Sequence, residues 1–150
     1  MSDTTDREFT IVREFAAPPE VVFDAWVDLD QSSQWMAPEG MTTPRERMYG
    51  DARPGGGYGA VMVLPDGLEA RIDGVYQEVD RPARLVFTWP DPTTPESVSL
   101  CTVTFVESAP GRTTMTFHLR APGPISPDDG AKLGWGSCFD KLTRHVERAS

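Results

Sequence analysis

Residues 58–79, YGAVMVLPDGLEARIDGVYQEV, form the stretch that decides the fold class of this chain. Apolar and polar side chains alternate along both of its halves, and a period of two is typical of β-strands with one buried face. Pro65–Asp66–Gly67 separates the halves. Such a turn between two alternating segments predicts a β-hairpin with strands over 58–64 and 68–79.

The same alternation continues on both sides of this hairpin. Further strands are expected over 8–15, 84–89, 98–106 and 113–119, with a weaker candidate over 41–48. A proline-rich segment at 90–96 is expected as a loop. No helical pattern interrupts the chain between 58 and 119, and strands that follow one another without helices predict an antiparallel sheet.

Helical patterns occur towards the two ends of the chain. Pro19 and Glu20 predict the start of a helix that carries Val22, Phe23 and Trp26 on one face. A second short helical piece is expected at about 30–35. Near the C-terminus, Ser126–Pro127 predicts the start of a helix that continues to about Arg148. Its apolar residues form one stripe, at spacings of four, three and four positions: Trp135, Phe139, Leu142 and Val146.

These elements predict an α+β domain in which a curved antiparallel sheet of six to seven strands wraps around a long C-terminal helix. Two short helices follow the first strand. One face of an antiparallel sheet needs cover, and the C-terminal helix is the only long element expected to supply it. We expect one domain over residues 8–150, preceded by a disordered tail over residues 1–7.

Composition excludes several classes of function. Fourteen Lys and Arg stand against 23 Asp and Glu, a formal net charge of −9, which disfavours binding to nucleic acid or to a membrane surface. Apolar runs are too short for a membrane span, and the polar N-terminus does not resemble a signal peptide. We therefore expect a cytoplasmic protein. The two distant cysteines make neither a metal motif nor a disulfide framework.

Cofactor and metal sites are not expected either. Residues 55–60, GGGYGA, contain a formal G-x-G-x-x-A, but a dinucleotide site needs a helix after it and a strand is predicted there. The two histidines, His118 and His145, do not have the spacing of a zinc site.

The width of the predicted sheet suggests a binding cavity. A helix is about 10 Å across and strands lie about 4.8 Å apart, so six or seven strands exceed the width of one helix. The sheet is expected to curl and to leave an apolar space at its flanks. Alternatively, these large residues simply fill the core. The candidate lining residues are Trp35, Tyr58, Met62, Tyr76, Phe87, Trp89, Phe105, Phe117, Trp135 and Phe139.

Polar residues on the strand over 68–79 give a second possibility. Glu69, Arg71 and Asp73 alternate, and on the inner face they could polarise a carbonyl or move a proton. The apolar residues between them favour the core, so the charged residues are expected to face solvent. In an enzyme, the plausible polar groups would be Tyr58, Tyr76, Glu69, Arg71 and His118, and no catalytic residue is assigned.

Several segments together resemble a known family. These are FTIVREF at 9–15, VFDAW at 22–26, DARPGG at 51–56, GVYQEV at 74–79 and RLVFTW at 84–89. In this order they resemble the SRPBCC superfamily of START-like and Bet v allergen-like domains. Within it, the chain is most similar to the group named after an activator of the heat-shock-protein-90 ATPase. The resemblance implies a helix-grip fold, as the strand pattern does independently.

The resemblance also implies what the cavity does. Relatives bind small hydrophobic molecules such as lipids, polyketides or aromatic compounds between the sheet and the C-terminal helix. Other relatives are cofactor-free cyclases or hydratases, and the group takes its name from a co-chaperone, so an enzyme or a protein-interaction module are the alternatives. The co-chaperone's additional domain is not in this sequence, so a chaperone partner is not expected, and a homodimer is left open.

One departure from the family concerns a histidine. Family members often end the last strand with a histidine that is followed by a glycine and an aromatic residue. Here His118 comes one position early, after Phe117. A shift by one residue in a strand moves a side chain to the opposite face of the sheet, so His118 is expected on the other face from the family's histidine.

Overall fold

The hairpin predicted over residues 58–79 is present in the computed structural model of the chain, which describes residues 7–37, 40–91, 94–121 and 131–149. Its strands are β3, Gly57–Val63, and β4, Glu69–Asp80. They pair in antiparallel fashion, with Ala60 opposite Ile72. Inner and outer residues alternate along β4, as the sequence pattern predicts.

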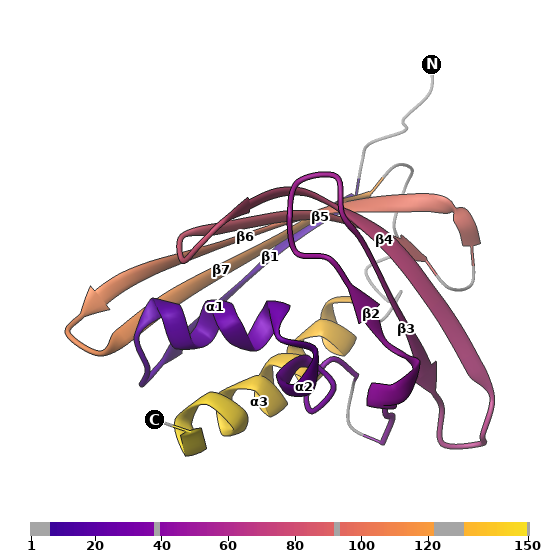
Figure 1. The fold of residues 1–150 in the computed structure, drawn as a ribbon, viewed down its shortest axis with the longest axis horizontal. Coiled ribbons are helices and arrows are strands. Elements are labelled where there is room, and N and C mark those ends of the chain that lie inside the picture. Colours follow the sequence, from indigo (N-terminus) through magenta and orange to yellow (C-terminus); the bar gives the residue numbers. More distant parts are fainter. Residues whose placement is uncertain (1–6, 38–39, 92–93, 122–130, 150) are drawn as a thin grey trace.

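Seven antiparallel strands form the sheet, in the order β1-β7-β6-β5-β4-β3-β2. The sheet curves strongly around the helices (Figure 1). The α+β class and the helix-grip architecture are thereby confirmed. The strands outside the central hairpin are β1, Arg7–Phe15; β2, Tyr49–Gly50; β5, Arg84–Asp91; β6, Thr94–Ala109; and β7, Arg112–Ala121.

Three boundaries differ from the sequence-based expectation. The weak strand candidate over 41–48 is wrong: Arg45–Arg47 is a 3₁₀ helix, and the edge strand is the short β2 that follows it. Pro44 precedes this turn and cannot donate a ladder hydrogen bond. The expected loop over 90–96 is strand at 90–91 and 94–96, because β5 and β6 extend into it, and residues 92–93 lie outside the described residues. Arg7 already pairs in β1, whereas residues 1–6 of the expected tail lie outside the described residues.

Three α-helices lie on the same side of the sheet, within its curve (Figure 1). They are α1, Pro19–Val27; α2, Leu29–Ser32; and α3, Ala131–Ala149. The predicted stripe of α3 is buried, including Phe139 and Leu142. The expected helix start at Ser126–Pro127 lies outside the described residues. No helix in the described part of the chain is long and apolar enough to cross a membrane.

Aromatic rings fill the space between α1, α3 and the sheet. Trp26 is central, with ring centroids 4.8 Å from Trp35, 5.9 Å from Phe139 and 6.2 Å from Phe117. Such edge-to-face, stacked and tilted pairs stabilise a core beyond the apolar area they bury. Large side chains therefore fill most of the space that the sheet leaves beside the C-terminal helix. The remaining free space lies outside this aromatic cluster.

Candidate functional site

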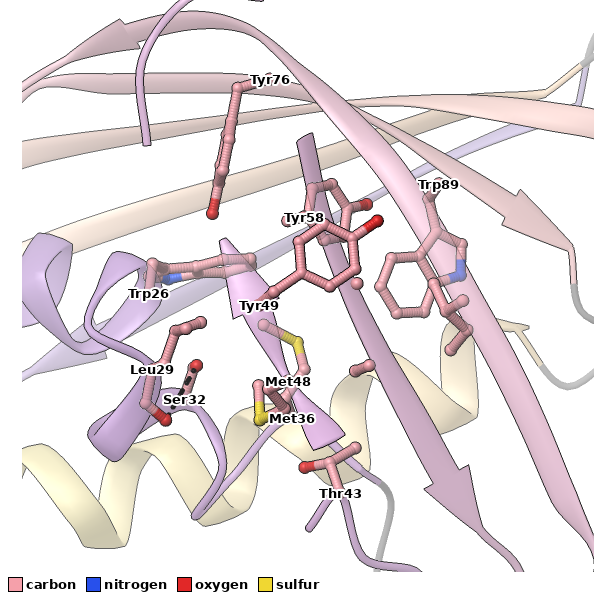
Figure 2. Close-up of a pocket in the computed structure, with 13 residues that line it drawn as sticks. Trp26, Leu29, Ser32, Met36, Thr43, Met48, Tyr49, Tyr58, Tyr76 and Trp89 are labelled. Atoms are coloured by element: carbon pink, nitrogen blue, oxygen red, sulfur yellow. Dashed lines mark hydrogen bonds between the residues drawn. The ribbon is translucent and has the colours of Figure 1, made fainter. Parts of the chain in front are cut away.

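A cavity of about 40 Å³ lies near the β2 end of the sheet, between β3, β4 and β5 on one side and α1, α2 and residues 43–49 on the other. That volume would hold about three water molecules. Figure 2 shows aromatic and methionine side chains around it. Its lining residues are Trp26, Leu29, Ser32, Met36, Thr43, Met48, Tyr49, Tyr58, Gly59, Ala60, Ile72, Tyr76 and Trp89.

Two glycines, one on β3 and one on β4, leave room for the rings of two tyrosines that line this cavity. A side chain at Gly59 would collide with the ring of Tyr49, which lies against the bare backbone of β3. A Cβ atom at Gly74 would lie 2.5 Å from both Cζ and the hydroxyl oxygen of Tyr58. Tyr58 thus crosses β4 and donates a hydrogen bond to the backbone carbonyl of Thr88 on β5. Glycine within a strand often marks such a close approach.

Trp26, one of the lining residues, carries a hydrogen-bond donor that is buried without a partner among the described residues. The Nε1 atom of Trp26 has no acceptor among the described residues, and the Trp26 side chain is only 4% exposed. By contrast, Trp35 donates its Nε1–H to the carbonyl of Ala25 at 2.9 Å. Buried polar groups in native structures nearly always have partners, so the exception at Trp26 requires an explanation.

The two inner tyrosines stay neutral at physiological pH. Burial raises the pKa of Tyr76 to about 12 and also raises the pKa of Tyr58, because a phenolate would lose its hydration. Among the described lining residues there is no carboxylate, histidine, lysine or arginine. The described wall therefore offers neutral donors and apolar surface.

Flexible side chains and a weakly paired segment close the cavity on the helical side. Met36 and Met48 both line it, and methionine adapts readily to new shapes because its chain is unbranched. The weakly paired segment is residues 41–50. Apart from the two-residue strand β2 at its end, it is attached to β3 by an isolated bridge between Thr42 and Val63. On the far side, Lys141 of α3 donates hydrogen bonds to the carbonyls of Ala37 and Met41, at 2.8 and 3.5 Å.

Replacing Lys141 with methionine is expected to loosen this segment while the sheet stays intact. The variant keeps an apolar chain of similar length but loses the donor to both carbonyls. Amide exchange at Thr42 and Val63, measured by NMR, should accelerate about tenfold. The amides of Ala60 and Ile72 in the neighbouring ladder serve as internal controls. Unchanged exchange at Thr42 would show that Lys141 does not hold the segment.

The structure brings some of the ten predicted lining residues together and separates the others. Tyr58, Tyr76 and Trp89 line the cavity. Met62 is half-buried at another position on β3. The remaining six belong to the packed core: Trp35, Phe87, Phe105, Phe117, Trp135 and Phe139. No described residue of α3 lines this cavity, which lies beside α1 and α2 instead.

Sequence reasoning missed other residues of the wall. Trp26 is predicted on the apolar face of the first helix, and this pattern does not distinguish a core position from a cavity wall. Met48 and Tyr49 lie in or beside the segment that was expected as a strand. Gly59 and Gly74 are the usable signal, because glycine inside an alternating strand indicates that another group approaches the backbone.

The charged residues of β4 lie outside the cavity, as predicted. Glu69, Arg71 and Asp73 are all exposed. Asp73 accepts hydrogen bonds from Arg71 and from the Tyr49 hydroxyl, and these interactions lower the pKa of its carboxyl group. His118 also faces outward, and its Nε2 atom lies within hydrogen-bonding distance of Glu8 Oε1, at 2.8 Å. Of the five polar candidates, the structure therefore brings only Tyr58 and Tyr76 to the cavity.

Comparisons with known proteins agree with this fold. A family model described as "Activator of Hsp90 ATPase homolog 1-like protein" matches residues 16–147. A solved protein from Rhizobium leguminosarum is 31% identical, with a TM-score of 0.75 over 98% of this chain and 99% of that chain. One from Chromobacterium violaceum is 25% identical, with a TM-score of 0.81 over 93% and 96%. The AHSA1 protein from Silicibacter pomeroyi is 25% identical, with a TM-score of 0.73 over 96% and 100%. No match was found among curated proteins.

Proposed function

The chain belongs to the Activator of Hsp90 ATPase homolog 1-like family, within the SRPBCC group, and we propose that it binds a small hydrophobic molecule in the cavity beside α1 and α2. The observation that carries this proposal is the composition of the wall. Aromatic and methionine side chains surround a space in which the described residues place no ionised group. Ligand sites are typically concave and apolar, with a few polar groups that set the orientation of the ligand.

The size of the cavity implies that binding enlarges it. A dry apolar cavity that accepts benzene has a volume of about 150 Å³, whereas this one measures about 40 Å³. Met36 and Met48 are the natural side chains to move, because methionine changes rotamer at little cost. Tyr49 also lines the cavity and is 47% exposed, with its hydroxyl bonded to the exposed Asp73. We therefore infer a ligand of about one or two rings, or a short acyl chain, admitted by displacement of these residues.

Proton-transfer chemistry has less support from the described wall. A cyclase or hydratase needs paired acid and base groups with suitable pKa values. Tyr58 and Tyr76 have pKa values shifted away from neutrality, so neither supplies a base. The geometry thus favours binding over catalysis.

A cavity-filling variant tests the proposal. Ala60 lines the cavity, and phenylalanine at this position should occupy the ligand's space. Thermal shift against a panel of fatty acids, aromatic ketones and polyketide-like phenols identifies compounds that stabilise the wild type. Ala60→Phe should raise the dissociation constant of any such compound at least tenfold, as measured by calorimetry.

Ala70→Phe is the matched control. Ala70 is half-buried on the same hairpin but does not line the cavity, so this variant should bind like the wild type. Native mass spectrometry of freshly purified protein adds a search for a co-purified molecule. A panel without any stabilising compound, together with no co-purified molecule, would refute the proposed function.

A further inference from the structure

We propose that Trp26 determines which hydrophobic molecules bind, by donating its Nε1–H to an uncharged oxygen of the ligand, such as a ketone, ester or amide carbonyl. This inference rests on the proposed function and adds a chemical class to it. Apolar walls alone would accept any hydrocarbon of suitable shape. A buried donor without a partner selects for molecules that carry an acceptor.

The reason to look for an acceptor is the state of the Trp26 indole. Its Nε1 atom has no hydrogen-bond partner among the described residues. Trp26 is only 4% exposed, so bulk water does not supply the missing hydrogen-bond acceptor. A donor buried in this way costs free energy unless some acceptor meets it.

The neighbouring tryptophan shows that the fold can satisfy an indole here. The rings of Trp26 and Trp35 lie 4.8 Å apart in one aromatic cluster. Trp35 donates to the carbonyl of Ala25, one residue before Trp26. The difference between them is position, because Trp26 lines the cavity and Trp35 does not. The missing acceptor can therefore arrive with a molecule that occupies the cavity.

The surrounding residues favour a neutral acceptor over an anion. The described wall has no cation, and a carboxylate buried without a counter-ion would be unfavourable. Tyr76 offers a second neutral donor, because its hydroxyl is protonated at physiological pH. Figure 2 shows this hydroxyl directed inward, towards the side of the cavity where Trp26 lies. A carbonyl oxygen has two lone pairs and can accept from both groups.

A pair of probes with the same shape isolates the acceptor. Acetophenone and α-methylstyrene differ in having a carbonyl oxygen or a methylene group at the same position. The wild type should bind acetophenone about fivefold more tightly, the factor expected for one net hydrogen bond. In ¹H–¹⁵N spectra, acetophenone should move the Trp26 indole proton downfield and α-methylstyrene should not. The Trp35 indole signal, already hydrogen-bonded, should keep its downfield position with either probe.

Two variants complete the experiment. Trp26→Phe keeps an aromatic ring without the N–H, and its preference for acetophenone should fall well below fivefold. Trp35→Phe is the matched control and should retain the fivefold preference. The spectra of the wild type require no variant. They therefore test the role of Trp26 even in the case that Trp26→Phe does not fold.

The possible outcomes separate this inference from the proposed function. Binding of both probes without preference, and with no selective shift of the Trp26 proton, overturns the role of Trp26 while leaving a hydrophobic site. This is also the result expected if a permanently bound water satisfies the indole. Failure of both probes to bind at millimolar concentration, with no compound from the panel binding either, overturns the hydrophobic site itself.

Discussion

Replacing Phe139 with alanine is expected to lower the free energy of unfolding by about 3–5 kcal/mol, the range for a large aromatic residue removed from a core. Phe139 is 0% exposed, and the centroid of its ring lies 5.1 Å from that of Phe117 and 5.7 Å from that of Trp135. It is the point at which α3 enters the aromatic cluster. The loss combines the transfer free energy of the ring with the cavity that rigid neighbours leave behind. Urea unfolding followed by far-ultraviolet circular dichroism measures the change.

An exposed position serves as the control for Phe139. Val106 on β6 is 60% exposed, so Val106→Thr should change stability by less than about 0.5 kcal/mol. A loss below about 1 kcal/mol for Phe139→Ala would show that the cluster relaxes around the gap, and that α3 is held mainly by other contacts.

Alanine at Gly74 is expected to cost about 2–3 kcal/mol, although it adds a single methyl group. That methyl would collide with the carbonyl oxygen of Thr88 and would lie 2.5 Å from the Tyr58 ring. Neither neighbour yields easily, because one is strand backbone and the other is held by its hydrogen bond to the same carbonyl. Displacement of Tyr58 would also reshape the cavity. Stability should therefore fall together with the affinity for any compound that stabilises the wild type.

Gly57 provides the matched control on the neighbouring strand. A Cβ atom there would meet its nearest neighbour at 3.7 Å, an ordinary van der Waals contact. Gly57→Ala should therefore be close to neutral, or slightly stabilising because alanine restricts the unfolded chain. Equal effects at Gly57 and Gly74 would indicate that strand propensity, and not the approach of Tyr58, explains the two glycines.

Local patterns explain why most of the fold could be predicted. Alternation over residues 58–79 reflects one buried face per strand, and this constraint acts within each strand independently of its partners. The apolar stripe of α3 works in the same way, because its residues must face whatever covers the sheet. The prediction was wrong at 41–48, where Pro44 and a 3₁₀ turn interrupt an apparent alternation. It was also wrong at 90–91 and 94–96, where strand pairing overrides the usual effect of proline.

The cavity depends on contacts between distant elements, so it was only partly predictable. Tyr58, Tyr76 and Trp89 were expected to line a binding space, and they meet at the cavity near β2. Phe117, Trp135 and Phe139 were candidates of equal standing, yet they pack against one another in the core. All are large aromatic residues on inward faces. Their spacing along the chain does not indicate which of them have neighbours on every side.

The amino-acid sequence by itself determined that this chain forms an α+β helix-grip domain, because burial of one face per strand and per helix leaves a repeating pattern in one dimension. The tertiary structure alone decided where free space is left and which donor within it has no partner. Trp26 and Trp35 are chemically identical, and only the arrangement of the backbone places a carbonyl beside one indole and not the other. Satisfaction of a buried hydrogen bond is a three-dimensional property.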